Sequence, residues 1–186
     1  MEHPMTTVLT DGTVTIRPVG VDDTDALFEA ASSSIAEMHP WMPWCHPEYT
    51  REESRAWLTH AEEQWRNGIE FPFAIIDAVS GRYLGGGGIN QISRLNRFAN
   101  LGYWVRTDAT GRGVATRATL LTARFGFEEL GLNRIEILAS VENLASRRVA
   151  ERSGATREGV LRRRIMLLER AHDAVIYSLV REEVMG

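Results

Sequence analysis

The sequence predicts one α/β domain, built on a mixed sheet with helices on both of its faces. Three observations support this prediction. The chain has 186 residues, of which 44% are hydrophobic, and this is enough for one sizeable core. Its apolar periodicity indicates a strand and two helices, then a strand meander, then a strand-helix-strand crossover. No repeat, low-complexity block or long linker divides the chain, so we expect residues 1–186 to form a single domain.

The N-terminal part carries signals for one strand and a first helix. Thr13–Val19, TVTIRPV, alternates like a strand. Asp22 or Asp23 can cap a helix. The apolar side of this helix is expected to contain Leu27, Ala31, Ile35 and Met38. Three prolines in His39–Pro47, HPWMPWCHP, predict a loop.

A second helix and an antiparallel meander are expected next. Thr50-Arg-Glu-Glu53 is a capping box, and Gly68 ends the helix that it begins. The expected buried stripe of this helix contains Trp57, Leu58, Ala61 and Trp65. The expected strands are 71–77, 82–92 and 99–106, the last one central. The glycine run 85–88 predicts a bulge or a close approach of backbones, with substrate access as a secondary alternative.

The C-terminal part reads as helix, strand, helix and two strands. A helix begins near Val114, and Asn133–Ser140 is a strand. ENLASRRVAERSG is a short helix that ends at Gly154. The final strands are expected near 156–168 and 171–181.

Composition excludes several classes of protein. The net charge of −4 argues against a general electrostatic grip on nucleic acid, although all 21 basic residues are arginine. We interpret the arginines of the C-terminal half as a solvated face, with a local phosphate site as the alternative. No apolar run is long enough for a membrane span, and the N-terminus lacks the features of a signal peptide. We therefore expect a cytoplasmic protein that does not interact with membranes.

The cysteine and histidine residues predict neither a disulfide nor a metal site. Cys45 is the single cysteine, so it has no intrachain partner. The spacing of His39, Cys45, His46 and His60 matches no standard metal site, and no metal is expected. Nor does any framework around Cys45 indicate a nucleophile.

The glycine turn at Thr110–Val114, TGRGV, is the first candidate functional feature. It precedes a helix whose first-turn amides are unsatisfied and carry partial positive charge. Because Gly111 and Gly113 have no side chains, a phosphate could approach these amides closely. The small side chain of Ala115 leaves the first turn uncrowded. Arg112, and Arg117 in the helix, could add charge-assisted contacts.

Several phosphate-binding motifs contain such a turn. A P-loop is excluded because the chain has no lysine. A dinucleotide fingerprint would need a third glycine, and the next acidic residue, Glu136, falls within a predicted strand. The remaining ligand is a pyrophosphate carried by coenzyme A, and the structural alternative is a turn that only caps the helix.

Segments spread over nearly the whole chain carry a resemblance to a known family. They are IRP (Ile16–Pro18), HPWMPW (His39–Trp44), LGYWV (Leu101–Val105), TGRGVATRA (Thr110–Ala118) and VENLASRRVAERSGATREGVLR (Val141–Arg162). Together they resemble the GNAT superfamily of acyl-CoA-dependent N-acyltransferases, and within it the ribosomal-protein serine/alanine N-terminal acetyltransferases of the Rim type. The resemblance implies a central, mostly antiparallel sheet with one splayed parallel pair. It also implies acetyl-CoA as co-substrate.

The resemblance assigns residues to the binding of acetyl-CoA. The pyrophosphate motif of the superfamily, Gln/Arg-x-x-Gly-x-Gly/Ala, falls on Thr110, Gly113 and Ala115, and Thr110 departs from it. The implied binding residues are Tyr103, Trp104, Val105, Thr110, Gly111, Arg112, Gly113, Val114, Ala115, Thr116, Asn143, Ser146 and Arg147. Without the resemblance, Tyr103 and Trp104 would be read as core packing, and Asn143 with Ser146 as a helix cap.

Two of these residues are implied to act in the transfer itself. The backbone amide near Val105 would polarise the thioester carbonyl. Ser146 would donate a hydrogen bond to the departing thiolate. Many members of the superfamily use a tyrosine four residues before the glycine that is Gly154 here, but this chain has Ala150 at that position.

The general base remains open. The branch sometimes supplies a glutamate where this chain has Ile165. Glu37, His39 and Glu70 are substitutes by position, and a water relay is a further alternative, because an α-amine has a pKa near ~8. Trp41, Met42 and Trp44 are expected either to bury themselves over the core or to wall the acceptor channel.

The acceptor that the resemblance implies is the N-terminal α-amine of a ribosomal or other protein or of a peptide, and a homodimer is left open. The near alternatives are another acyl donor or a small-molecule amine such as an antibiotic or a polyamine. A non-catalytic CoA-binding module is suggested by the missing tyrosine and by Ile165. A nicotinamide-dependent oxidoreductase is a third hypothesis.

Overall fold

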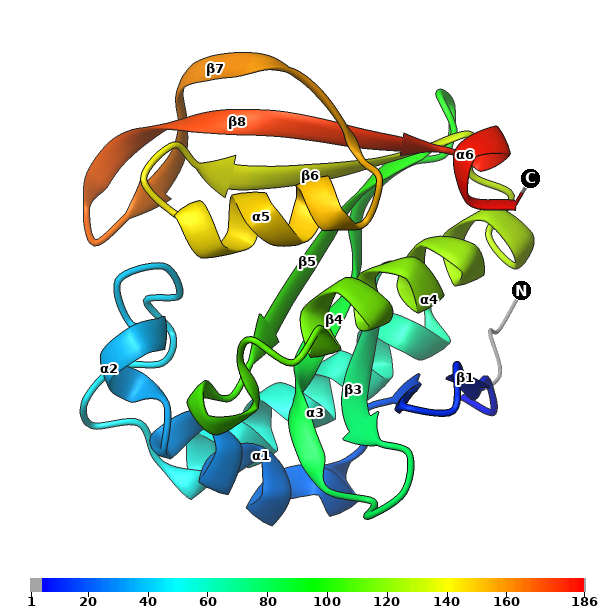
Figure 1. Ribbon diagram of the computed structural model, residues 1–186. Coiled ribbons are helices and arrows are strands. Elements are labelled where there is room, and N and C mark those ends of the chain that lie inside the picture. The colour runs from blue at the N-terminus through cyan, green and yellow to red at the C-terminus, as the bar shows by residue number, and fades with distance from the viewer. Residues whose placement is uncertain (1–4, 186) are drawn as a thin grey trace.

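The structure is a computed structural model that describes residues 5–185, and it contains an eight-stranded mixed sheet (Figure 1). The strands lie in the order β1-β2-β3-β4-β5-β6-β8-β7. Their bounds are β1 Leu9–Thr10, β2 Val14–Pro18, β3 Phe71–Asp77, β4 Tyr83–Ser93, β5 Phe98–Val105, β6 Arg134–Ser140, β7 Thr156–Leu167 and β8 Arg170–Val180. The helices are α1 Thr24–Ser32, α2 Ile35–Met38, α3 Arg51–Arg66, α4 Val114–Glu128, α5 Leu144–Arg152 and α6 Arg181–Met185, with short 3-10 turns at Val21–Asp23 and Thr107–Ala109. The predicted fold class is confirmed.

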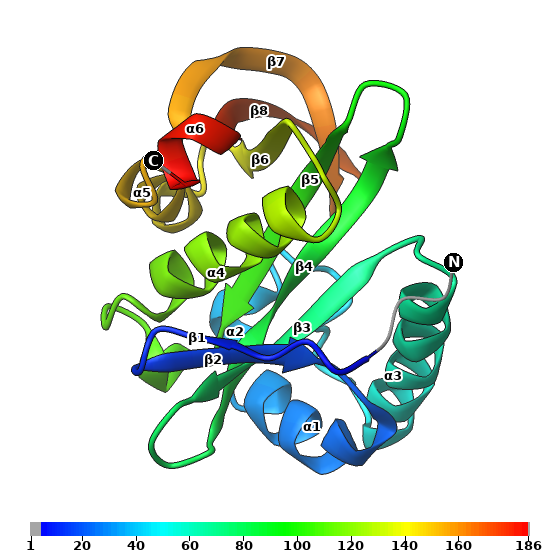
Figure 2. The ribbon, with the colours of Figure 1, turned by 90° about the vertical axis from the view of Figure 1, so that its right-hand side faces the viewer.

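Helices cover both faces of the sheet (Figure 2). The largest core cluster joins α4 and α5 to one face, through residues such as Leu121, Phe125 and Ala150. A second cluster joins α1 and α3 to the other face, through Leu27 and Leu58 among others. Within residues 5–185, no helix combines the length and apolar character that crossing a bilayer requires.

Most predicted elements are found within one or two residues of their expected bounds. The capping box of α3 is present, with the Thr50 side chain accepting from the Glu53 amide. The glycine run of β4 combines a register shift with close approach: a Cβ on Gly85 would lie 2.2 Å from the Trp104 carbonyl oxygen. Both predicted consequences of that run therefore occur.

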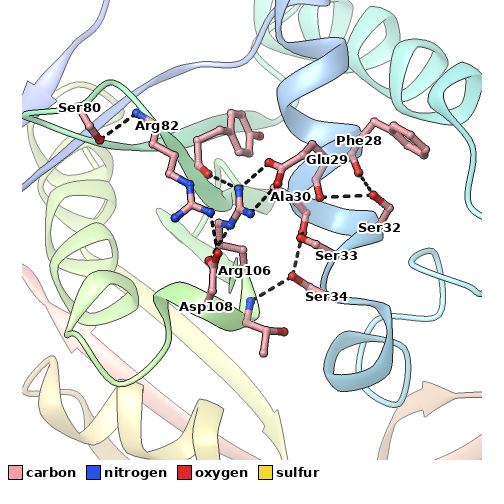
Figure 3. A network of polar contacts seen from close by, with 12 residues as sticks. Phe28, Glu29, Ala30, Ser32, Ser33, Ser34, Ser80, Arg82, Arg106 and Asp108 are labelled. Atoms are coloured by element: carbon pink, nitrogen blue, oxygen red, sulfur yellow. Dashed lines mark hydrogen bonds and ion pairs between the residues drawn. The ribbon is translucent and has the colours of Figure 1, made fainter.

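The single helix expected to run from Asp22 or Asp23 to Met38 is wrong, because the chain breaks it into α1 and α2. The hydroxyl of Ser32 donates to the Phe28 carbonyl at 2.6 Å, and that of Ser34 donates to the Ala30 carbonyl at 2.8 Å (Figure 3). These side chains take carbonyls that a continuing helix would use. Nor does the Asp23 side chain cap α1, because it pairs with Arg17 at 2.5 Å.

Trp57 was expected in the buried stripe of α3, and this is wrong. Leu58, Ala61 and Trp65 are buried there, whereas Trp57 is 44% exposed. It lies on the side of α3 that faces a large cavity described below.

The parallel pair β5–β6 diverges soon after it forms. The two strands pair only over Phe98–Asn100 and Arg134–Glu136. Beyond these residues β5 continues to pair with β4, and β6 with β8. The splayed pair implied by the sequence is therefore present, and it leaves the second half of β5 open on one side.

Candidate active site

The glycine turn leads into α4 with its backbone bare. Gly111 and Gly113 have φ angles of +74° and +78°, in the left-handed region that favours glycine. A Cβ at either position would meet no atom within 4 Å. In the described chain, no side chain caps α4 and its first turn has no acidic residue, whereas α3 has both kinds of group. We call Thr110–Thr116 the cradle, because its geometry fits an anion.

A network of ion pairs fixes the approach to the cradle (Figure 3). Arg106, only 2% exposed, binds both carboxylate oxygens of Glu29 on α1, at 2.6 and 2.7 Å. It also binds Asp108 at 2.7 Å, and Arg82 binds Asp108 at 2.6 Å. The hydrogen bonds from Arg106 lower the pKa of Glu29, so the pair stays ionised near neutral pH. The backbone between β5 and the cradle is thereby held against α1.

The arginines near the cradle are engaged to different degrees. Arg112 is exposed. Arg117 is paired with Asp11 at 2.7 Å. Arg147 donates to the Val141 carbonyl at 2.9 Å, so its expected contact with a nucleotide would have to replace or share that bond. Of these three arginines, Arg112 is the one whose guanidinium has no hydrogen bond to the described residues.

A cavity of about 140 Å³, the strand gap, opens where β5 and β6 diverge. It contains the predicted residues Asn143 and Ser146 at the start of α5. The Asn143 side chain accepts from the Ser146 amide at 3.0 Å, which confirms the predicted helix cap. The lining residues are Trp41, Met42, Leu101, Gly102, Tyr103, Ile137, Leu138, Ala139, Ser140, Asn143, Ser146, Ile165 and Leu167.

Val105 presents its amide on the open side of β5. The amide of Arg106 donates to the Leu84 carbonyl at 2.9 Å, toward β4. Because successive backbone amides of a strand point in opposite directions, the amide of Val105 points away from β4. This orientation suits an amide that could bind an oxygen in the strand gap.

Tyr103 spans the strand gap with its side chain. Its hydroxyl donates to the Ser146 carbonyl at 2.8 Å and lies 3.3 Å from the Ser146 hydroxyl. Burial raises the pKa of Tyr103 to about 12. The side chain therefore does more than pack, and it remains protonated at physiological pH.

A larger cavity of about 430 Å³, the aromatic cavity, lies on the other side of β5. Its walls include Trp44, Tyr49 and Trp57, and its floor contains Gly102 of β5. The full lining is Leu27, Met42, Trp44, His46, Tyr49, Glu53, Trp57, Glu70, Pro72, Gly86–Gly88, Ile89, Asn90, Gly102, Tyr103 and Trp104. The aromatic cavity and the strand gap share Met42, Gly102 and Tyr103, so they meet at the middle of β5.

The proline-rich loop packs partly on the core and also lines the two cavities. Met42 packs against the cluster of Ala31, Met38 and Cys45 and also lines both cavities. Trp41 lines the strand gap, and Trp44 lines the aromatic cavity. The same segment therefore packs on the core and lines the cavities, and its role as a wall of the acceptor channel stays a prediction.

The predicted substitutes for a general base separate into different places. Glu70 lines the aromatic cavity. Glu37 instead accepts from the Thr107 hydroxyl at 3.0 Å, and His39 lines neither cavity. Ile165 lines the strand gap without an ionisable group.

Sequence reasoning missed two ionisable residues of the aromatic cavity. Glu53 binds the His46 ring nitrogen at 2.9 Å, and this bond is the largest cause of its lowered pKa. From the sequence, the capping box accounts for Glu53, and His46 is a loop residue with no metal-site spacing, so neither residue indicates a cavity. The prolines and tryptophans that alternate before His46 were the signal from which a cavity-lining loop could have been predicted. Within residues 5–185, no group of three His, Cys, Asp or Glu side chains is placed to hold a metal ion.

Comparisons with known proteins identify relatives over most of the chain. The family model described as an acetyltransferase (GNAT) domain matches residues 13–156. YdaF of Bacillus subtilis (strain 168), provisionally named a ribosomal N-acetyltransferase, is 30% identical over 179 residues, covering 93% of this chain and 94% of YdaF. The ribosomal-protein-serine acetyltransferase of Escherichia coli (strain K12) is 30% identical over 91 residues, covering 49% of this chain and 51% of that protein.

Solved structures share the fold. RimJ from Mycobacterium smegmatis, determined in complex with CoA-disulfide, superposes with a TM-score of 0.82 at 26% sequence identity. The match covers 96% of this chain and 88% of RimJ.

Proposed function

The chain belongs to the GNAT acetyltransferase family and is an N-acetyltransferase, and we propose that it transfers the acetyl group of acetyl-CoA to the N-terminal α-amine of a ribosomal protein. Two relatives are named for ribosomal acceptors, and RimJ was solved with a CoA derivative. The observation that carries the proposal is the junction of the strand gap and the aromatic cavity at Gly102 and Tyr103.

The proposed donor site runs from the cradle into the strand gap. The amides of Val114, Ala115 and Thr116 would hold the pyrophosphate, since no side chain of the described chain competes for them as a cap. Arg112 would add charge. The open edge of β5 would pair with the amide-rich arm of the co-substrate as a strand would. Asn143 closes the end of this path at α5.

The proposed transfer is a direct attack in which positioning contributes most of the acceleration. The amine enters from the aromatic cavity and forms a bond to the acetyl carbon while the thioester bond breaks. The Val105 amide binds the carbonyl oxygen, and Ser146 donates a hydrogen bond to the departing sulfur. The proton of the amine leaves through water or to Glu70, which lines the aromatic cavity.

The aromatic cavity also supports a second acceptor class, a cationic or aromatic small-molecule amine. Trp44, Tyr49 and Trp57 offer ring faces to a cation or to another ring. Glu53 and Glu70 add negative charge. The two acceptor classes differ in size: a ribosomal protein extends beyond the aromatic cavity, whereas a small-molecule amine does so less.

A direct assay tests the proposal. The protein is incubated with acetyl-CoA and peptides that begin with serine or alanine, alongside polyamines and aromatic amines, and free thiol and product mass are followed. We expect peptides to gain one acetyl group at the α-amine. Acetylation confined to small amines would mean that the acceptor is a small-molecule amine and not a peptide. Binding of coenzyme A with no transfer to any amine would mean that the protein is a non-catalytic CoA-binding module.

Gly102→Val tests whether the acceptor enters through the aromatic cavity. Position 102 is on the face of β5 that carries Trp104, and a Cβ there would meet no atom within 4 Å. The added side chain would occupy the floor of the cavity, where its Cβ has room. We expect KM for the peptide to rise about tenfold or more, with the Kd for coenzyme A changed less than about twofold. Unchanged peptide kinetics would place the acceptor elsewhere.

A further inference from the structure

We infer that Tyr103 is a positioning residue for the reaction, because its hydroxyl donates to the Ser146 carbonyl and so holds Ser146 in place at the strand gap. The inference rests on the proposed function, in which Ser146 donates to the departing sulfur. It adds the residue that holds Ser146 in its orientation. The two residues are 43 positions apart in sequence, so their contact exists only in the folded sheet.

Two contacts give the tyrosine this role. Its hydroxyl lies 2.8 Å from the Ser146 carbonyl oxygen and 3.3 Å from the Ser146 hydroxyl oxygen. The Ser146 amide is held separately by the Asn143 side chain at 3.0 Å. The serine is thus fixed through its backbone from two directions, and its hydroxyl has one neighbouring hydroxyl, that of Tyr103.

The helix itself offers no other hydroxyl for this purpose. Between its first and last residues, α5 carries Ser146 alone among hydroxyl side chains. Ala150, one turn further along, is a fully buried alanine. The second hydroxyl at this end of α5 comes from β5, across the strand gap, where the two elements lie opposite each other (Figure 1).

The protonation state of Tyr103 defines what it can do. Since burial raises its pKa to about 12, the phenol keeps its proton throughout the reaction. It is a poorer acid than the thiol that is formed, so it does not protonate the sulfur. As the carbon–sulfur bond breaks and the carbon–nitrogen bond forms, the proton released by the amine balances the one that the thiolate takes up. The single proton of the Tyr103 hydroxyl is donated in a hydrogen bond to the Ser146 carbonyl, the Ser146 hydroxyl donates to sulfur, and neither group loses its proton overall.

A double-mutant cycle tests the inference. Tyr103→Phe, Ser146→Ala and the double variant are compared by steady-state kinetics with acetyl-CoA and a peptide beginning with serine. We expect Tyr103→Phe to lower kcat about tenfold and to change KM for acetyl-CoA less than about twofold. The double variant should be no slower than Ser146→Ala alone, because the tyrosine acts through the serine.

Tyr177→Phe is the matched control. The Tyr177 hydroxyl also binds α5, through Glu151 at 2.8 Å, but Tyr177 lines neither cavity. We expect its kcat to stay within about twofold of the unaltered protein. An equal loss in both tyrosine variants would make the effect of Tyr103 a general loosening of α5, and the inference would be overturned.

A second readout does not depend on the acceptor. The pKa of the thiol of bound coenzyme A is measured from thiolate absorbance between roughly pH 6 and 10. We expect Tyr103→Phe to raise this pKa by roughly 0.5 to 1, because a Ser146 hydroxyl that is less well oriented stabilises the thiolate less. An unchanged thiol pKa, independent effects in the cycle, or a change confined to KM would each overturn the inference. Absence of transfer by the unaltered protein, with the thiol pKa shifted as expected, would count against the proposed function alone.

Discussion

Glu158 is held by two partners that favour its ionised form. It binds Arg134 at 2.6 Å and accepts from the Ser178 hydroxyl at 2.7 Å. These hydrogen bonds, the Arg134 bond first, lower its pKa from 4.5 to about 2. A carboxyl group with a lowered pKa in the folded state stabilises the fold above its unfolded pKa, and this contribution is lost as the pH falls through the folded pKa.

Glu158→Gln should therefore change the pH dependence of stability. Because the side chain of Glu158 is 38% exposed, solvent screening reduces the ion pair to about 1 kcal/mol at pH 7. We expect the free energy of unfolding to fall by that amount at pH 7, and the difference from the unaltered protein to vanish as the pH falls from 4.5 to about 2. Urea unfolding across this range measures it. Glu63→Gln, on the exposed side of α3, is the control, and a difference that persists at the lowest pH would contradict the assignment.

Single residues could be predicted where their role is local. The glycines at 111 and 113 and the cap formed by Asn143 depend on neighbours within a few positions, and the structure confirms their conformations. The contact of Tyr103 with Ser146 and the opening of Trp57 to a cavity depend on how distant strands and helices meet. Periodicity cannot supply that information, because it describes one element at a time.

At the scale of elements, the cradle makes a prediction about one glycine. Gly113→Ala adds a Cβ in the open space at the N-terminus of α4 and forces alanine into a left-handed conformation. We expect the Kd for coenzyme A to rise about tenfold or more, because the pyrophosphate loses its close approach to the amides. Isothermal titration calorimetry measures it.

Gly154→Ala separates lost binding from backbone strain. Gly154 follows α5 with a φ of +80°, and a Cβ there would also meet no atom within 4 Å. The strain introduced is therefore similar, but the residue lies at the opposite end of α5 from Ser146. We expect comparable losses of thermal stability in both variants, and a raised Kd only in Gly113→Ala. Equal affinities would remove the cradle from the binding site.

Element types could be predicted because strand alternation, capping boxes and glycine stops act locally. The break after α1 could not be predicted, because a run of serines is compatible with either a helix or a turn. Which of the two forms depends on the carbonyls to which the serine hydroxyls donate. The two-residue β1 and the short α6 are too brief for a periodic signal. The arginines 162–164 lie in a register shift of β7, the edge strand, where exposed charge discourages pairing with another sheet. That placement favours the solvated face over a phosphate site.

The whole molecule consists of two groups of strands that share one core but few ladder pairs. Among residues 5–185, β1–β5 and β6–β8 are joined in the sheet only by the short parallel pairing at Phe98–Asn100. In the proposed complex, acetyl-CoA spans the divergence between them, bound to the cradle on one side and to α5 on the other. A ligand that bridges two groups of strands stabilises the native state as a whole and slows local opening at the bridge.

Acetyl-CoA should therefore protect the divergence and the cradle together. At about 100 times its Kd we expect the free energy of unfolding to rise by about 2.7 kcal/mol, which corresponds to roughly 5–11 °C in Tm for a domain of this size. Hydrogen exchange followed by mass spectrometry should show slower exchange in Leu101–Val105 of β5 and in the first turn of α4, with β1 and the α3 helix changed less. In Gly113→Ala, at the same ligand concentration, both the Tm shift and the local protection should shrink together. Protection that appears on α3 and spares the cradle would mean that the ligand binds across the aromatic cavity instead of the strand gap, and the two substrate paths would have to be exchanged.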